Sequence, residues 1–195
     1  MVTTVTAPAS TGRPLRLSLR LDSPLATVRA ILTGHEPYPA VVVDSSWNLV
    51  EANATVALLL EGVSEKPPEA PANVLRVALC PDGMAPRVLN LGRWRAHLMD
   101  RLRREVEWTH DPELHRLLTE LSAYPGASPR GDALETEPTE LAVPLRLRTS
   151  LGDLSLLSTV ATFGTAVDVT LEGLAIETFM SADADTSRRL RGSFL

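Results

Sequence analysis

Histidine is the residue type best suited to bind a metal ion or to transfer a proton near neutral pH. The chain has four of them: His35, His97, His110 and His115. The last two flank Asp111 and Glu113, in a short cluster that superficially resembles a metal site. Pro112 and the helix boundary expected there keep these side chains from converging on one ion, and no second cluster completes a tetrahedral set. We therefore expect no metal site.

The residues that could support covalent or phosphate chemistry do not occur in the patterns that such chemistry needs. No Gly-x-Ser-x-Gly turn is present, and the glycines form no phosphate-binding loop. The acidic pairs lack a spacing that would tune a general acid. Cys80 is the one cysteine and has no Cys–His signature around it, so we interpret it as a small buried apolar residue. The sequence predicts that the protein is not an enzyme and has no cofactor.

Aromatic and aliphatic residues within the expected strands and helices are candidate walls of a pocket for an apolar ligand. Such a pocket needs an apolar interior, and for a ligand with an acidic head group it also needs a polar side chain that holds that group. The candidate wall residues are Trp47, Trp94, Leu98, Phe163, Ile176 and Phe179. Ordinary core packing is the alternative interpretation of each of these residues.

Three basic side chains are candidate anchors for a ligand carboxylate: Arg76, Arg95 and His97. Their alternative interpretation is a solvated helix face with ion pairs. The expected central strand also carries several hydroxyl groups, at Ser155, Ser158, Thr159 and Thr162. Buried hydroxyl groups need hydrogen-bond partners, so these either bond locally or line a pocket that contains water.

Local sequence patterns predict the strands and helices that could position these residues. A β-hairpin is predicted near residues 40–52. Its first strand is the β-branched run at residues 40–43, its turn is residues 44–46, and its second strand is the apolar segment that follows. Asn53, Asn73 and Asn90 are placed to cap the next helices, and Ser23-Pro24 and Asp111-Pro112 begin others. Apolar residues spaced as on a helix face predict a long core-facing helix, at Leu91, Trp94, Leu98, Leu102 and Val106.

Three further strands are expected near the C-terminus, around residues 141–148, 154–163 and 174–180, followed by a helix capped by Asp183. Two strands, a group of helices and three closing strands predict an α+β fold. Its five-stranded antiparallel sheet would be covered on one face by helices. This order of elements is that of the PAS fold.

Composition and charge restrict the function classes. The chain of 195 residues has a formal net charge of −5, which argues against direct binding of nucleic acid. No apolar run approaches the roughly 20 residues needed to span a bilayer, so we expect no membrane segment and a cytoplasmic location. Lys66 is the one lysine among 19 basic residues, and this arginine bias is typical of a high-GC, actinobacterial-type genome.

The chain divides into two parts. Residues 1–22 are rich in Thr, Ala, Ser and Pro and are expected to form a flexible arm, and residues 23–192 a single PAS-like ligand-binding domain. Leucines alternate with arginines and Ser18 within the arm, which predicts an edge strand or a segment that pairs with a partner chain.

Three ordered blocks resemble the ligand-binding domain of MmyB-like transcription regulators. Residues 35–53 read HEPYPAVVVDSSWNLVEAN, residues 73–104 begin NVLRVALCPDGMAPRVLNLGRW, and residues 144–183 begin PLRLRTSLGDLSLLSTVATFG. The resemblance implies a PAS-like domain that binds an apolar small molecule, with a fatty acid as the kind of ligand reported in the family. Members of the family typically carry an N-terminal helix-turn-helix domain, and the residues before His35 are too few and too rich in Pro and Thr to form one.

Two functions are consistent with these observations. The first is a small-molecule sensor related to transcription regulators, without its own DNA-binding module, which acts as a homodimer or with a helix-turn-helix partner. The alternative is a protein–protein interaction or dimerisation domain. A cavity of several hundred Å³ beneath the helices favours the sensor. A filled core with an exposed apolar patch favours the interaction domain.

Overall fold

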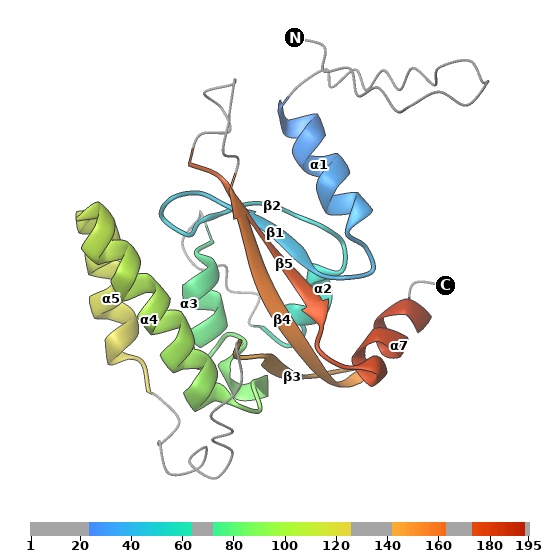
Figure 1. Ribbon diagram of the computed structural model, residues 1–195. Helices are drawn as coiled ribbons and strands as arrows, with labels where there is room; N and C mark the ends of the chain where they lie inside the picture. Colours follow the sequence, from blue (N-terminus) through green and yellow to red (C-terminus); the bar gives the residue numbers. More distant parts are fainter. Residues whose placement is uncertain (1–23, 64–71, 126–141, 163–172, 194–195) are drawn as a thin grey trace, which may run out of the picture.

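A computed structural model describes residues 24–63, 72–125, 142–162 and 173–193 (Figure 1). The helices are α1 (Pro24–Gly34), α2 (Val56–Leu59), α3 (Val74–Leu79), the short 3-10 helix η1 (Ala85–Arg87), α4 (Leu91–Thr109), α5 (Pro112–Ala123) and α7 (Ala184–Gly192). The strands are β1 (Ala40–Val43), β2 (Leu49–Ala52), β3 (Leu145–Thr149), β4 (Gly152–Thr162) and β5 (Ala175–Ser181).

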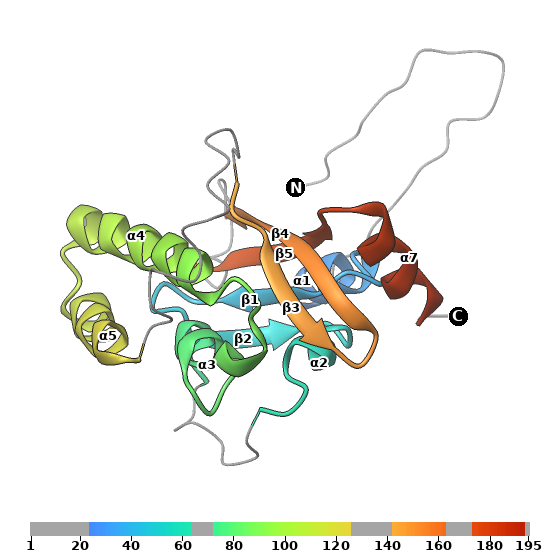
Figure 2. The same cartoon turned by 90° about the horizontal axis from the view of Figure 1, so that it is seen from below.

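The five strands form one sheet in the order β2-β1-β5-β4-β3, and every neighbouring pair is antiparallel. The first and last strands of the chain therefore meet in the middle of the sheet, where β1 pairs with β5 from Ala40 opposite Thr178 to Val43 opposite Ala175. The long strand β4 pairs with β3 and with β5, so the sheet curls along its length (Figure 2). The predicted α+β class and the five-stranded antiparallel sheet are confirmed.

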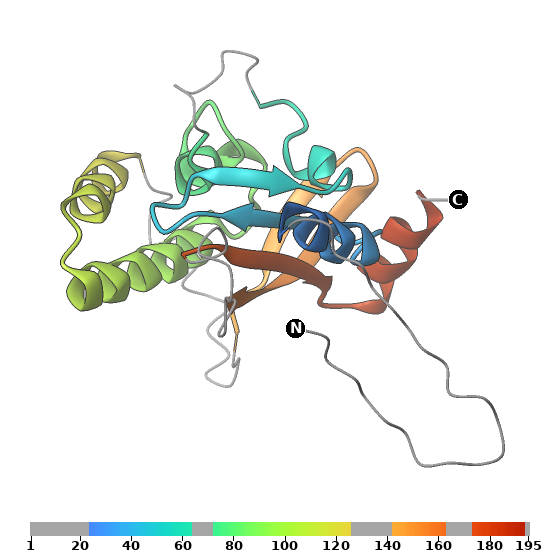
Figure 3. The same cartoon turned by 90° about the horizontal axis from the view of Figure 1, so that it is seen from above.

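The two faces of the sheet have separate apolar cores. Successive side chains of a strand point to opposite faces. Val41 and Val43 of β1 accordingly lie in the large core, whereas Ala40 and Val42 pack in a smaller one with residues of α1. The structure differs here from the prediction that helices cover one face, because α1 lies on the opposite face (Figure 3). The reason is that all the side chains of β1 are buried, so this strand needs cover on both sides.

The large core lies between the sheet and the helices of the central part of the chain. The predicted apolar stripe of α4 is confirmed, since Trp94, Leu98 and Leu102 are all buried. Helix α5 packs on α4 and contributes Leu114, Leu117 and Leu121 to the same core. The sheet and α3, α4 and α5, whose arrangement Figure 1 shows, thus all contribute side chains to one apolar core.

Asparagine side chains fix connections around this core. Asn73 caps α3 as predicted, and its side-chain oxygen accepts hydrogen bonds from the backbone N–H groups of Leu75 and Arg76 at 3.2 Å. The prediction that Asn53 caps the next helix is wrong, since the residue before α2 is Thr55. Asn53 instead accepts a hydrogen bond from the N–H of Ala40 and donates to two carbonyl groups, which ties β1 to the segment before it.

Asn90 directly precedes α4, but the prediction that its side chain caps this helix is wrong, because it makes no cap hydrogen bond. Its amide nitrogen instead donates to the carbonyl oxygen of Pro144 at 2.7 Å, and its oxygen accepts from the N–H of Arg146 at 3.0 Å. An asparagine side chain can satisfy a neighbouring strand as readily as a helix end. Asn90 therefore ties the start of α4 to β3.

The predicted arm, residues 1–22, and its expected edge strand lie outside the residues that the structure describes, as does Phe163. Within the described ranges, no helix combines the length and the apolar character needed to cross a bilayer.

Candidate ligand-binding site

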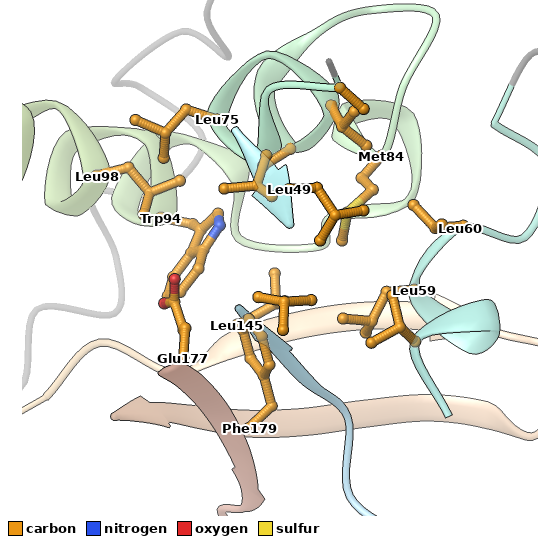
Figure 4. Close-up of a pocket in the computed structure, with 16 residues that line it drawn as sticks. Leu49, Leu59, Leu60, Leu75, Met84, Trp94, Leu98, Leu145, Glu177 and Phe179 are labelled. Carbon is orange, nitrogen blue, oxygen red and sulfur yellow. The ribbon is translucent and has the colours of Figure 1, made fainter. Parts of the chain in front are cut away.

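A cavity of about 120 Å³ lies in the large core between the sheet and the helices (Figure 4). Its wall is apolar except for one acidic side chain and the indole nitrogen of a tryptophan. The lining residues are Val41, Leu49, Val56, Leu59, Leu60, Ala72, Val74, Leu75, Val77, Ala78, Met84, Trp94, Leu98, Leu145, Glu177 and Phe179. Leu60 is 40% exposed, so the cavity reaches the surface beside α2.

The pleat of the sheet and the turns of the helices bring these residues together. Val41 and Phe179 come from the neighbouring strands β1 and β5, and Leu145 comes from the edge strand β3, all on the face turned toward the large core. Helix α4 contributes Trp94 and Leu98, four residues apart and therefore on one side of the helix. The cavity is thus bounded by strands and helices from distant parts of the chain.

Glu177 on β5 is the one acidic residue in this wall and is only 5% exposed. Its carboxylate Oε1 accepts a hydrogen bond from Nη1 of Arg101 at 3.3 Å, and the Ser158 hydroxyl on β4 also bonds to the carboxylate. Burial raises the pKa of the Glu177 carboxyl above its ordinary value, because transfer from water disfavours the charged form. Arg101 and Ser158 oppose this shift and hold the carboxylate in place.

Arg101 lies on α4 and is held from a second side by an aromatic ring. Its guanidinium carbon lies 4.2 Å from the centre of the Trp47 ring, a cation–π contact. Nε1 of Trp47 in turn donates a hydrogen bond to Oε2 of Glu105 at 2.7 Å. The guanidinium is therefore engaged outside the cavity wall, and Glu177 is the member of this chain of contacts that faces the cavity.

The structure brings together three of the six predicted wall residues. Trp94, Leu98 and Phe179 line the cavity. Trp47 lies outside it, beneath Arg101. Ile176 packs on the opposite face of the sheet, in the core with α1.

The three predicted carboxylate anchors do not line the cavity. Arg76 is paired with Glu120, with Nη2–Oε2 at 2.8 Å, and both lie in a separate polar groove. Arg95 donates hydrogen bonds to the carbonyl oxygens of Leu121 and Ser122. These arginines join α3 and α4 to α5.

His97 is also an unsuitable cation for binding a carboxylate. Its ring lies beside that of Trp94, with ring centres 5.6 Å apart. Burial, and then the charges of Arg101 and Arg104, lower the pKa of His97, so the neutral imidazole is favoured. The side chain therefore packs against the outer part of the cavity wall without carrying a fixed charge.

Sequence reasoning missed Glu177. Assigning the side chains of the expected strand to alternate faces would have revealed it, because Glu177 and Phe179 must then share one face. Ile176 must then lie on the other face. An acidic residue on the core-facing side of a central strand is rare unless it is paired, which makes it a candidate for a functional group.

In the part of the chain that the structure describes, no group of three or more His, Cys, Asp and Glu side chains could hold a metal ion. The segment around His110 instead connects two helices. His110 adopts a left-handed conformation at the end of α4, with φ of 55°. The Asp111 side chain accepts a hydrogen bond from the N–H of Glu113 at 2.7 Å and so begins α5.

Comparison with known protein families decides the identity of the domain. The MmyB-like transcription regulator ligand binding domain matches residues 25–192, from α1 to the end of α7. The chain belongs to this family. No curated protein matches the chain. The match covers every element that lines the cavity, so the cavity lies within the ligand-binding domain of a transcription regulator family.

Proposed function

We propose that this MmyB-like domain senses a mainly apolar small molecule of fatty-acid-like type, which binds in the cavity between the sheet and α3 and α4. The observation that carries the proposal is the apolar wall of that cavity within a domain of a ligand-binding family. An apolar chain transferred from water to such a wall gains about 0.8 kcal/mol for each buried methylene group.

The size of the cavity limits how such a ligand can bind. Pockets for drug-sized ligands have volumes of about 300–1,000 Å³. The cavity of about 120 Å³ is smaller than that, and smaller than the several hundred Å³ that would favour the sensor over an interaction domain. A longer chain must therefore extend past Leu60 toward the surface or displace side chains of the wall. Met84 is suited to such movement, because its unbranched side chain adapts readily to a changed volume.

The regulatory output belongs to the same proposal. The family supports a role in transcription regulation, and we propose that binding of DNA is carried out by a helix-turn-helix unit with which this domain acts, as a homodimer or with a partner protein. A cytoplasmic location stays a prediction. The proposal assigns no catalytic step to the domain. The alternative, an interaction domain with a filled core, is less consistent with a cavity at the centre of the core.

Native mass spectrometry of the gently purified protein tests the proposal. We expect an adduct with the mass of a lipid-like small molecule, which disappears after extraction with organic solvent and returns when decanoate or decanol is added. A protein that is free of ligand in every preparation, and that shows no heat of binding with either fatty acids or fatty alcohols by calorimetry, would contradict the proposal.

A further inference from the structure

The one charged group in the cavity wall, Glu177, indicates which polar group a ligand needs in order to bind there. Glu177 lies on the central strand β5, and Figure 4 shows its carboxyl group pointing toward the Trp94 ring at one end of the cavity, with Leu60 at the other. Its side chain is 6% exposed. A carboxylate buried in an apolar wall is unfavourable unless hydrogen bonds replace those it makes with water.

The contacts of Glu177 leave part of this requirement unmet. A carboxylate offers about four acceptor positions. The structure gives Glu177 two partners among the described residues, the Arg101 guanidinium at 3.3 Å and the Ser158 hydroxyl. The ion pair to Arg101 is long for a charge-assisted hydrogen bond, which is usually about 2.7–2.9 Å. The carboxylate can therefore accept a further hydrogen bond from the cavity side.

A second polar atom lies in the same wall. Figure 4 shows the indole nitrogen of Trp94 turned toward the cavity. None of the hydrogen bonds that the structure gives for the described residues uses this N–H, and it is not one of the fully buried polar atoms without a partner, so it is accessible from the cavity. The wall thus presents an acceptor at Glu177 and a donor at Trp94 in surroundings that are otherwise apolar.

We propose that Glu177 is the polar recognition group of this cavity and that the ligand carries an uncharged hydrogen-bond-donating group, a hydroxyl or an un-ionised carboxyl, on an apolar body. Such a group donates to the Glu177 carboxylate, and its own oxygen can accept from Nε1 of Trp94. This inference rests on the proposed function and specifies the ligand class of the same site.

An ionised fatty acid does not fit this wall. Where the ion pair with Arg101 keeps Glu177 ionised, the ligand carboxylate would face the Glu177 carboxylate, and like charges in a site of low dielectric constant repel strongly. Arg101 does not remove the difficulty, because it is already engaged with Glu177 and with the Trp47 ring. A fatty acid satisfies the site only in its un-ionised form.

Two probes with the same chain and different polar groups test the inference. Octanol and octanoate are titrated into the full chain at neutral pH, and binding is followed by calorimetry. We expect octanol to bind at least ~10-fold more tightly than octanoate, since a hydrogen bond to a buried charged group is worth about 1.5–3 kcal/mol. In Glu177→Gln the repulsion is absent and the amide can donate to a carboxylate. The preference should fall to about 3-fold or less.

Glu107→Gln is the matched control, because Glu107 lies on the exposed side of α4 and the same substitution there should leave both affinities unchanged. Near-ultraviolet circular dichroism establishes that each variant is folded. If octanoate binds the original protein as tightly as octanol does, or if Glu177→Gln keeps the full preference, the role of Glu177 is wrong while the sensing function stands. If neither probe binds and no fatty acid binds, both the role of Glu177 and the proposed function are wrong.

Discussion

Ala78→Leu tests whether the cavity is an unfilled volume of the folded domain. Ala78 lies on α3 and lines the cavity with Val74 and Val77 of the same helix. Leucine is a good helix former, so the substitution leaves the intrinsic stability of α3 nearly unchanged. The added atoms enter space that is empty in the structure, and they occupy volume that a ligand needs.

The size of the effect follows from the cavity volume. Enclosed empty cavities in protein cores cost about 24 cal/mol per Å³. A cavity of about 120 Å³ that reaches the surface at one end therefore lowers the free energy of unfolding by at most about 3 kcal/mol. The carbon atoms that leucine adds, at about 0.8 kcal/mol each, are worth about 2.4 kcal/mol in all. We therefore expect Ala78→Leu to stabilise the ligand-free domain by about 2 kcal/mol, which raises its Tm by about 4–8 °C.

Thermal unfolding with and without octanol measures both consequences. Octanol should raise the Tm of the original protein, and it should have little effect on Ala78→Leu. Ala96→Leu is the control, because Ala96 is exposed on α4 and the same atoms added there fill no cavity. A large loss of stability in Ala78→Leu would show that the core is already filled. An unchanged response to octanol would place the ligand elsewhere.

Three further substitutions address the buried polar contacts of the domain. Glu177→Gln tests the pKa shift. Burial raises the pKa of the Glu177 carboxyl group in the folded protein above its pKa in the unfolded chain. This group therefore does not lower the free energy of unfolding below the unfolded-state pKa, and it lowers that free energy increasingly as the pH rises through the folded-state pKa. Urea unfolding from about pH 4 to about pH 8 should show the free energy of unfolding of Glu177→Gln rising relative to the original protein, and a fall would mean that Arg101 outweighs burial. Arg101→Met leaves the carboxylate buried without its cation and should destabilise the domain by about 3 kcal/mol at neutral pH, with part of the loss recovered when Glu177→Gln is added. Asn53→Ala leaves the N–H of Ala40 and two carbonyl groups without their partner, and it should lower the free energy of unfolding by about 1–3 kcal/mol in urea titrations; no change would mean that water replaces the amide.

Local patterns were sufficient to predict most of the fold. The apolar spacing from Leu91 to Val106 corresponds to α4, and the Asn73 and Asp183 caps hold because each side chain has a free backbone N–H within reach. Asn53 was misassigned because an asparagine before a helix can equally bond to the neighbouring strand. The hairpin that pairs Val41 with Ala52 brings Ala40 beside it. The cover on the second face was missed because a run of four apolar residues does not reveal which face packs on which helix.

The site was less predictable, and for a physical reason. Trp94, Leu98 and Phe179 are large apolar residues of core-facing elements, so they would line a cavity as readily as they would fill it, and the sequence does not distinguish the two. The candidate anchors were selected by charge, but a partly exposed arginine near a helix end finds a carboxylate or a carbonyl, as Arg76 and Arg95 do. Burial of Glu177 depends on which strands flank β5, and that pairing joins residues far apart in the chain.

Two features that do not favour folding coincide in this cavity, and a ligand would offset both. Folding alone is better served by a filled volume and by an uncharged residue at a buried position. A ligand whose apolar body fills the cavity and whose hydroxyl group donates to Glu177 removes both disadvantages at once. Ala78→Leu fills the empty volume, and Glu177→Gln removes the buried charge. The loss of octanol binding in one variant and the loss of discrimination against octanoate in the other would therefore separate the apolar and the polar parts of recognition. If Glu177→Gln abolished octanol binding as well as the discrimination against octanoate, the cavity and the carboxylate would have to be parts of one structural support for the core.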